Sequence, residues 1–214
     1  YNKRPEDLVK QQGRISTIQG TFVPTGGGFG SSLLADCTTA ESAVVTGESI
    51  VLEQRIEGGS LQQLAYGTAS AKSITCQFWF RSPKSGIHCI ALHRTTAARS
   101  IVKEFTIASA DTYEKFSVTF PGDTTGVITD DASDGMRVCF PLVAGATFQV
   151  AADSWASGRD YATSNQQNLL DNTANNIYIT GVQLEVGSVA TDFAHEDYGT
   201  TLARCQRYFW RQID

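Results

Sequence analysis

Few residues in this sequence have the types and spacing that enzymatic chemistry requires. The histidines are His88, His93 and His195, and none is paired with a cysteine at a recognisable catalytic spacing. His88 and His93 stand five positions apart in a strand-like stretch and the turn after it, so they point to opposite faces and do not share a metal ion. The patterns GxSxG and HExxH are missing. The sequence therefore offers no visible nucleophile for hydrolysis.

Paired carboxylates are the remaining candidates for catalysis, since glycoside hydrolysis needs only two of them at a suitable separation. Glutamates in the strand-like stretches alternate with apolar neighbours, as solvated residues of an outer sheet face do: Glu53, Glu57, Glu104, Glu114 and Glu185. A sequence does not give the distance between two side chains. We predict a protein that is not an enzyme and keep a glycan-degrading enzyme as an alternative.

The aspartate-rich stretch DTTGVITDDASDG is a candidate calcium site. Asp130, Asp131 and Asp134 supply carboxylate oxygens, which calcium prefers, but Ala132 and Ser133 break the order of an EF-hand loop. The alternative is an ordinary turn in which the side-chain oxygens accept hydrogen bonds from nearby backbone N–H groups. We predict no cofactor, with calcium near these aspartates as the one candidate.

Aromatic residues in polar surroundings are the better indication of a binding site. Five of them stand among Asn, Gln, Arg and Asp: Trp79, Tyr113, Trp155, Tyr161 and Tyr178. A sugar ring stacks on such a face while neighbouring polar groups bond its hydroxyls. The candidate glycan-binding residues are Trp79, Trp155, Arg159, Asp160 and Tyr161. The alternative is that Trp155 and Tyr161 cap the open end of the fold.

The elements that must position these residues are strands, because apolar residues recur with period two. The expected strands cover residues 31–37, 49–57, 72–81, 86–94, 100–108, 114–120, 135–143, 147–151 and 176–186. Turn-rich stretches such as EGGS and SPKSG separate them, and helical periodicity is nearly absent before residue 199. We predict an all-β fold, a jelly-roll β-sandwich of two antiparallel sheets with a short helical turn near the C-terminus.

The stretch KSITCQFWFR shows how the sheet faces are assigned. One face, expected to lie in the core together with Val182 and Leu184, consists of Ile74, Cys76, Phe78 and Phe80. Trp79 then lies on the outer face between Gln77 and Arg81. A large aromatic side chain there either lies under another segment or offers a flat surface to a partner.

Three segments follow from these patterns. Residues 1–13 are polar and contain Pro5 and Gly13, which is typical of an arm or linker. Residues 14–196 form the sandwich. Residues 197–214 close the same domain, beginning as one or two helical turns with Thr200 as the N-cap and finishing as an aromatic strand.

Composition and charge exclude several functions. The 214 residues carry a net charge of −5 without long charged runs, which argues against binding to nucleic acid. No stretch is apolar over the length needed to cross a bilayer. The cysteines are odd in number, irregularly spaced and without a CxxC pair: Cys37, Cys76, Cys89, Cys139 and Cys205. Neither a disulfide framework nor a zinc site is indicated, and buried thiols suit a chain assembled in a reducing cytoplasm.

The closing stretch NNIYITGVQLEVGSVATDFAHEDYGTTLARCQRYFW resembles the terminal segment of a group of tailed-bacteriophage virion proteins. These are tail-fibre, head-fibre and other structural proteins with a jelly roll like that of carbohydrate-binding modules. Upstream, YGTASAKSITCQFWFRSPKSG, DTYEKFSVTFPGDTTG and SNQQNLLDNTANNIYITGVQLEVG resemble the same group in the same order. The resemblance covers roughly residues 14–212 and brings no matched set of binding residues.

The resemblance implies a non-enzymatic structural protein of the virion, assembled in the host cytoplasm. It would be displayed as a fibre or surface module that contacts host surface polysaccharide or other virion proteins, with residues 1–13 as its attachment. It also implies a homotrimer, because fibre-type phage proteins commonly assemble as threefold bundles. The alternative within the same fold is a capsid or tail decoration or connector protein with only protein partners.

Overall fold

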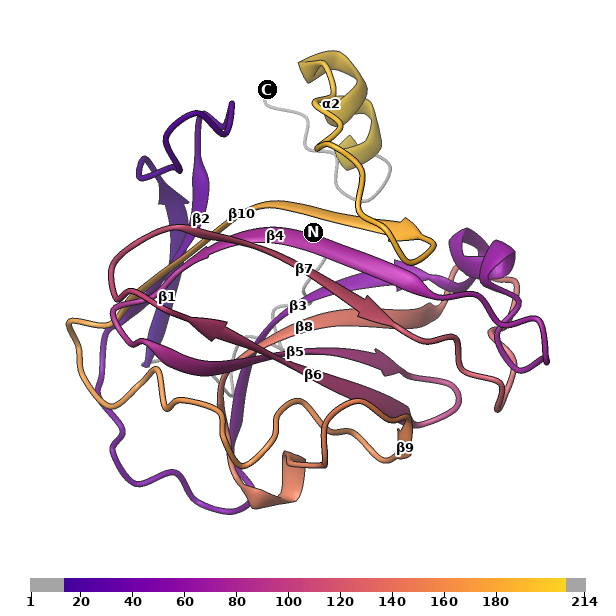
Figure 1. Ribbon diagram of the computed structural model, residues 1–214, viewed down its shortest axis with the longest axis horizontal. Coiled ribbons are helices and arrows are strands. Elements are labelled where there is room, and N and C mark those ends of the chain that lie inside the picture. The colour runs from indigo at the N-terminus through magenta and orange to yellow at the C-terminus, as the bar shows by residue number, and fades with distance from the viewer. Residues whose placement is uncertain (1–13, 207–214) are drawn as a thin grey trace, which may run out of the picture.

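The chain forms ten strands within residues 14–206, the part that the computed structural model describes, and most of them are the alternating stretches (Figure 1). Sheet A contains, in spatial order, β1 (Ile15–Gly20), β2 (Ser32–Cys37), β10 (Asn176–Val186), β4 (Ile74–Arg81) and β7 (Glu114–Phe120). Sheet B contains β3 (Ser49–Glu57), β8 (Asp134–Ala144), β5 (Gly86–Arg94), β6 (Arg99–Ile107) and β9 (Ala156–Ser157).

The two sheets pack face to face with neighbours that are distant in sequence. β10 lies between β2 and β4, β3 lies beside β8, and these pairings are antiparallel. Such crossovers between two antiparallel sheets define a jelly roll. The predicted fold class is therefore confirmed.

The core between the sheets is built as the alternation of KSITCQFWFR predicts. Ile74, Cys76, Phe78 and Phe80 are at most 3% exposed and belong to one cluster. Leu184 packs against that cluster and is half-buried. The prediction for Val182 was wrong, because its side chain is 44% exposed.

Some local elements differ from the sequence-based expectation. Residues 147–151 do not form a strand: η2 (Ala146–Phe148) is a short 3-10 turn, and only a single parallel bridge joins Gln149 to Ala162. The sequence patterns also did not predict β1, β9 and the 3-10 helix η1 (Gly58–Leu64). The two-residue β9 and the 3-10 turns are too short to show a period, and β1 (ISTIQG) shows no alternation of apolar residues, so tertiary contacts decide them.

A bulge at Gly181 interrupts β10. The pairing of β10 with β4 shifts between Thr180 and Gln183, and Gly181 has a φ of 60°, a conformation that glycine adopts readily. A Cβ at this position would meet the ring of Phe29 at 2.5 Å. Glycine is required here both by the backbone conformation and by the loop that lies over it.

The helix α2 (Tyr198–Gln206) stands apart from the sandwich, and all its residues are exposed (Figure 1). Its N-cap is Asp197 and not the predicted Thr200, since the Asp197 carboxylate accepts a hydrogen bond from the Thr200 N–H at 3.0 Å. Within the described residues, no helix has the length and apolarity of a membrane span. The predicted arm (1–13) and the predicted aromatic strand after the helix lie outside the described residues.

Candidate functional site

The outer face of sheet A carries a row of large side chains placed by strand register. Arg81 on β4 pairs directly with Tyr178 on β10. Tyr113 immediately precedes β7, whose first residue, Glu114, pairs with Phe80. The register therefore places Tyr113, Arg81 and Tyr178 side by side across three strands.

Trp79 lies in the next row of the same face, two residues before Arg81. It pairs with Thr180 on one side and with Lys115 on the other. Its side chain is half-buried, whereas Phe78 before it and Phe80 after it are buried in the core. The prediction that Trp79 faces outward is confirmed.

Phe22, from the loop between β1 and β2, joins this row. The guanidinium carbon of Arg81 lies 5.2 Å from the centre of the Phe22 ring and 5.0 Å from that of Tyr178, while the two rings are 5.8 Å apart. The Tyr113 hydroxyl donates a hydrogen bond of 2.8 Å to the Phe22 carbonyl. We call Phe22, Trp79, Tyr113 and Tyr178 the aromatic platform.

The Arg81 side chain is held from the other side by Asp111. Arg81 donates through Nε to the Asp111 carbonyl at 2.8 Å, and its terminal nitrogen lies 2.9 Å from the Asp111 carboxylate. This second contact is an ion pair in which the Asp111 side chain keeps 59% of its surface exposed. The platform thus combines a fixed cation with aromatic rings and an accessible carboxylate.

A shallow polar hollow of about 430 Å³ adjoins the platform on the same face. It is lined by Gln77, Lys115, Phe116, Ser117, Ser188, Val189, Ala190, Thr191 and Asp192. Lys115 is the register partner of Trp79, so the hollow begins where the platform ends. Hydroxyl, ammonium and carboxylate groups therefore stand beside the half-buried Trp79.

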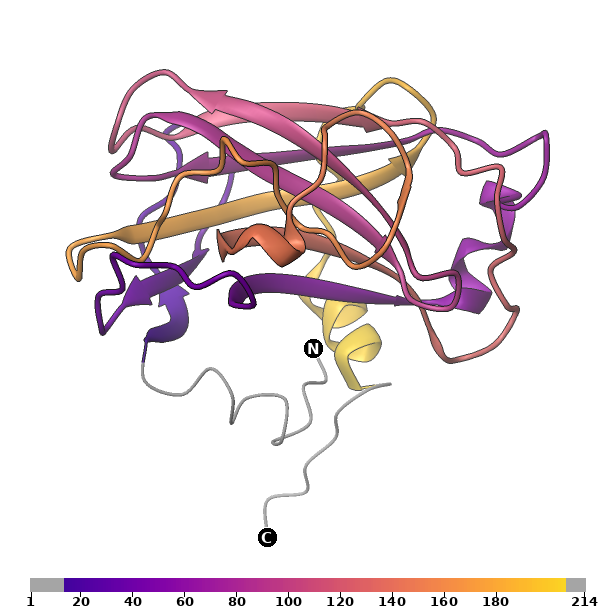
Figure 2. The same ribbon diagram turned by 90° about the horizontal axis from the view of Figure 1, so that it is seen from below.

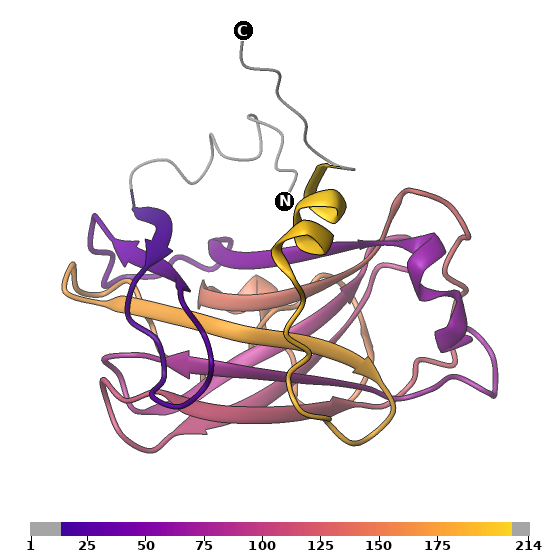
Figure 3. The same cartoon turned by 90° about the horizontal axis from the view of Figure 1, so that it is seen from above.

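The far wall of the hollow is the segment that follows β10, which folds back over sheet A (Figure 3). Gln77 donates a hydrogen bond of 2.7 Å to the Thr191 carbonyl, and Thr75 donates one of 2.8 Å to the Gly187 carbonyl. These bonds explain why two polar residues of an outer face are only 1% exposed. The segment thus gives the hollow a fixed wall.

The outer face of sheet B, in contrast, is covered by another part of the chain. The chain between β8 and β10 crosses it (Figure 2) and packs Tyr161, which is 1% exposed, and Phe148 against Ala91, Val102 and Cys139. The apolar faces of these side chains form a second small core. This surface is therefore unavailable to a stacked sugar over most of its area.

The structure divides the five predicted site residues between these faces. Trp79 lies on sheet A, whereas Asp160 and Tyr161 are buried on sheet B, where the Ser100 hydroxyl bonds the Asp160 carboxylate at 3.1 Å. Arg159 is exposed but donates to the Tyr161 hydroxyl. Trp155 donates a hydrogen bond of 2.8 Å to the Pro121 carbonyl.

Trp155 also packs against Tyr66, with ring centres 5.9 Å apart, at the margin of the main core. This position matches the alternative stated from the sequence, in which Trp155 caps an end of the fold. A substitution there removes packing as well as a ring, so it does not isolate ligand binding.

A charge cluster occupies the uncovered end of sheet B. The Glu53 carboxylate lies 2.9 Å from Arg55 and 3.1 Å from Arg137, and Arg137 also contacts Asp134 at 2.6 Å. Burial opposes ionisation of Glu53, but both guanidinium groups outweigh it and hold the pKa of Glu53 below its usual value. Glu53 is thus neither the solvated residue that the sequence predicts nor a carboxyl raised in pKa to act as a general acid.

His93 beside this cluster makes the stability of the protein depend on pH. Burial, followed by the charges of Arg137 and Arg159, lowers the pKa of His93 to about 4, against the smaller opposing effect of Asp134 and Glu53. Between pH 6.5 and 4 the unfolded chain binds a proton at this group that the folded chain does not bind. The contribution of His93 to stability is therefore lost as the pH falls, by about 2 kcal/mol from pH 7 to pH 5.

The measurement is urea unfolding of the parent and of His93→Gln at pH 7 and pH 5. The parent is expected to lose about 2 kcal/mol more than the variant over this interval. The contributions of His88 and His195 to the pH dependence are present in both proteins, so they cancel in the comparison. Equal losses in the two proteins would contradict a buried, neutral His93.

The candidate calcium residues are engaged in local contacts. Asp131 accepts a hydrogen bond from the Ser133 N–H at 2.9 Å, as in an ordinary aspartate turn, and Asp134 is paired with Arg137. No cluster of three or more potential metal ligands occurs between residues 14 and 206. Cys76, Cys89 and Cys139 are buried free thiols, as predicted for small core residues, and Cys37 is buried as well.

Phe22 of the platform and Arg81 beside it are the residues of this surface that sequence reasoning did not select. Arg81 could have been found from the alternation, because it shares the outer face with Trp79. Phe22 carried no such signal, since it belongs to a loop and the fold alone brings it beside β10.

Comparisons with known proteins found similarity among solved structures alone. No protein-family model and no curated protein sequence matches the chain. Among solved structures, the enzymatically active domain of tailspike protein 4 of bacteriophage CBA120 aligns with 80% of this chain at 11% identity and a TM-score of 0.42. The alignment covers 18% of the tailspike chain, so this chain spans less than a fifth of that protein.

Two carbohydrate-binding proteins align over most of their own length. The N-terminal cellulose-binding domain of Cellulomonas fimi β-1,4-glucanase C shares 15% identity, with 74% of this chain and 80% of that domain covered and a TM-score of 0.39. The family 11 carbohydrate-binding module of Clostridium thermocellum, in complex with a β-1,3-1,4-mixed-linked tetrasaccharide, shares 13% identity, with 83% and 85% covered and a TM-score of 0.40. The ligands of those proteins are properties of those proteins.

Proposed function

We propose that the chain is a non-catalytic glycan-binding module, and that the outer face of sheet A is its binding surface. The observation that carries this proposal is the aromatic platform with the polar hollow beside it. The half-buried rings of Trp79 and Tyr178, fixed by strand register, allow a pyranose ring to stack, which removes its apolar C–H surface from water. The groups of Asp111, Lys115 and Asp192 stand where they can bond the sugar hydroxyls.

The glycan is proposed to be a bacterial surface polysaccharide, and the chain to be a structural protein of a phage virion. This part of the proposal is supported by the resemblance of residues 14–212 to tail-fibre and head-fibre proteins. The threefold assembly that the resemblance implies belongs to the same proposal, and light scattering on the chain with residues 1–13 retained measures it. A decoration or connector protein with only protein partners is the second candidate, and the exposed α2 favours it as a surface for assembly.

The test is retention of the protein on immobilised lipopolysaccharide and capsular polysaccharide from candidate hosts. Trp79→Ala and Tyr178→Ala are each expected to weaken retention about tenfold or more, which corresponds to the loss of roughly 1.4 kcal/mol of stacking. Tyr198→Ala is the matched control, because Tyr198 is 79% exposed on α2 and belongs neither to the aromatic platform nor to the lining of the hollow.

The proposed binding surface would be contradicted if both platform variants were retained as well as the parent, or if the Tyr198→Ala control lost as much retention as they do. If the parent protein binds none of the polysaccharides, the glycan-binding proposal fails and the second candidate, a decoration or connector protein, is favoured. Circular dichroism of each variant separates a lost contact from a lost fold.

A further inference from the structure

A second group of aromatic rings lies over the outer face of sheet A, separate from the aromatic platform. Phe29 comes from the loop between β1 and β2, and Phe193 and His195 come from the segment after β10. The ring centre of Phe29 lies 5.0 Å from that of Phe193 and 5.4 Å from that of His195, and the latter two are 4.9 Å apart. We call these three residues the ring trio. Neither core cluster of the described chain contains any of them, so the trio packs outside the sandwich.

Phe29 is fixed to β10 directly beside the row of Trp79. Thr180 is the register partner of Trp79, and its hydroxyl donates a hydrogen bond of 2.9 Å to the Ser31 carbonyl. A Cβ on the next residue, Gly181, would meet the ring of Phe29 at 2.5 Å. The Phe29 ring therefore lies against the backbone of β10, one residue beyond the partner of Trp79.

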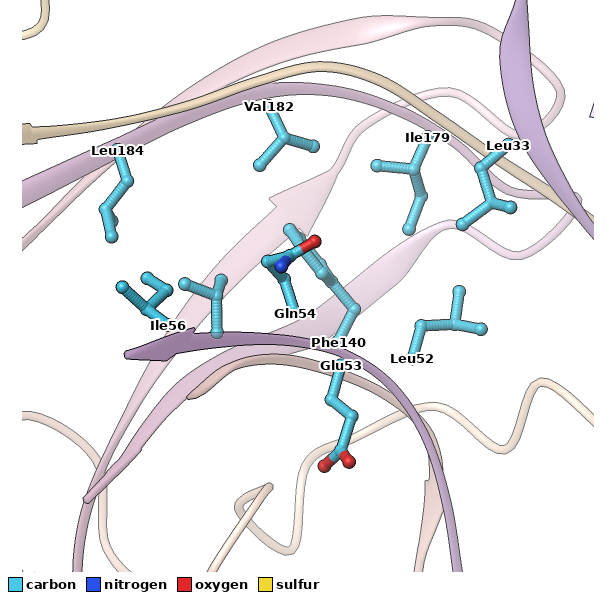
Figure 4. Close-up of a pocket in the computed structure, with 10 residues that line it drawn as sticks. Leu33, Leu52, Glu53, Gln54, Ile56, Phe140, Ile179, Val182 and Leu184 are labelled. Atoms are coloured by element: carbon cyan, nitrogen blue, oxygen red, sulfur yellow. The ribbon is translucent and has the colours of Figure 1, made fainter. Parts of the chain in front are cut away.

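The bulge in β10 creates the seat for this ring. Two residues of β10, Gly181 and Val182, lie opposite the single residue Phe78 of β4. Val182 points toward the opposite sheet, where it lines an apolar cavity of about 290 Å³ between the sheets (Figure 4). Gly181 therefore presents backbone without a side chain to the Phe29 ring.

Phe193 and His195 are fixed to the next row of the same face. The side-chain carbonyl of Gln183, the next outward residue of β10, accepts a hydrogen bond of 2.7 Å from the N–H of Ala194, which stands between the two rings in sequence. Gly28, with a φ of 74°, approaches so closely that a Cβ there would lie 3.1 Å from Nε2 of His195. The position of the trio relative to Trp79 is therefore set by contacts with β10 and with the loop before β2.

His195 gives the trio a polar, accessible member. Phe29 and Phe193 are half-buried, whereas His195 is exposed although its ring contacts both of them. An exposed imidazole offers a ring face together with two nitrogen atoms that bond hydroxyl groups. The trio thus combines aromatic rings with polar atoms, as the platform does.

We propose that the ring trio is a second stacking position for the glycan, so that this surface binds a segment of several sugars along a linear polysaccharide and not one terminal sugar. The inference rests on the proposed function and extends it. Along β10, the row of Trp79 lies between the row of Tyr178 and the trio. The rows of Arg81 and Gln77, which pair with β10 at the two ends of this stretch, are about 13 Å apart along β4, which is longer than one pyranose ring.

A polysaccharide that stacks on Trp79 therefore continues onto His195, with the polar hollow on the β7 side of its path. Two stacking positions that are occupied by one chain bind it more tightly than either position alone, because the second contact is intramolecular.

The test is competition by glycan fragments of graded length. The polysaccharide that retains the parent protein is cut into oligosaccharides from a single sugar upward, and each fragment competes with the immobilised polysaccharide. For the parent, we expect the inhibitory concentration to fall by about tenfold once a fragment reaches from Trp79 to the trio. For His195→Ala, this gain with length is expected to disappear, while the shortest inhibitory fragments act on it as they act on the parent.

Two further variants serve as controls. His195→Tyr keeps a ring at this position and is expected to keep the gain with fragment length. Trp79→Ala is expected to weaken inhibition by fragments of every length, because it removes the other stacking position. Since His195 is exposed, its replacement is expected to leave the core intact, and urea unfolding of each variant checks this.

The outcomes separate this inference from the proposed function. A gain with length that is the same in the parent and in His195→Ala would overturn the second stacking position and leave the glycan surface in place. Equal inhibition of the parent by fragments of all lengths would overturn the recognition of several sugars in the same way. If the parent is retained on no polysaccharide, the proposed function fails, and this inference fails with it.

Discussion

Replacing Asp123 by alanine is expected to lower the free energy of unfolding by about 3–5 kcal/mol, as the removal of one partner of a buried ion pair does. Asp123 is 2% exposed, and its carboxylate lies 2.5 Å from Arg94, which is 1% exposed, and 2.8 Å from Arg99. The substitution leaves the Arg94 guanidinium buried without a counter-charge.

The same carboxylate organises the loop before β8. It accepts a hydrogen bond from the Thr125 N–H at 3.0 Å, while Arg94 donates to the Thr125 carbonyl at 2.7 Å and lies 5.3 Å from the centre of the Tyr66 ring. Burial opposes ionisation of Asp123, but the bonds from Arg99, Thr125 and Arg94 outweigh it and lower its pKa. Loss of the carboxylate thus affects three elements at once.

Chemical unfolding of the variant at pH 7 provides the measurement. Asp130→Ala is the matched control, because Asp130 is exposed and its loss is expected to change stability by about 0.5 kcal/mol or less. Combining Asp123→Ala with Arg94→Met should recover much of the loss, since no buried charge then remains. A loss under about 1 kcal/mol for Asp123→Ala alone would mean that Arg94 reaches water.

Replacing Phe78 by alanine is expected to cost a similar amount, about 3–5 kcal/mol, through a cavity at the centre of the main core. Phe78 is fully buried, and its ring centre lies 5.1 Å from that of Phe105, 5.6 Å from that of Phe116 and 5.0 Å from that of Phe140. These rings come from both sheets, so the substitution loosens the packing of one sheet on the other.

Phe22→Ala is the control for this change, because Phe22 is 60% exposed and its truncation leaves no buried cavity. Urea denaturation with a fluorescence readout compares the two variants. Equal losses for Phe78→Ala and Phe22→Ala would contradict the assignment of Phe78 to the centre of the core. Trp79, which points outward next to Phe78, is present in both variants, so its fluorescence follows the unfolding of the same strand in each.

The strand pattern of the sequence predicted β3, β5 and β7 with the bounds observed, because long alternating runs carry their own signal. β9 and η1 were missed, since their existence depends on contacts with distant segments. For the candidate site, alternation predicted that Trp79 faces outward. It did not predict that Tyr161 and Asp160 are buried, because the loop that contains them has no period and is folded onto sheet B by tertiary packing.

The sequence by itself determined the direction in which each strand residue points, since that follows from the covalent alternation of the backbone. It predicted Phe78 inward, Trp79 outward and Val182 inward. Only the tertiary structure decided what meets each side chain: four aromatic rings at Phe78, an open polar hollow beside Trp79 and an uncovered cavity at Val182. The physical reason is that facing is a local property of one strand, whereas burial depends on segments that the fold brings together from far apart in the chain.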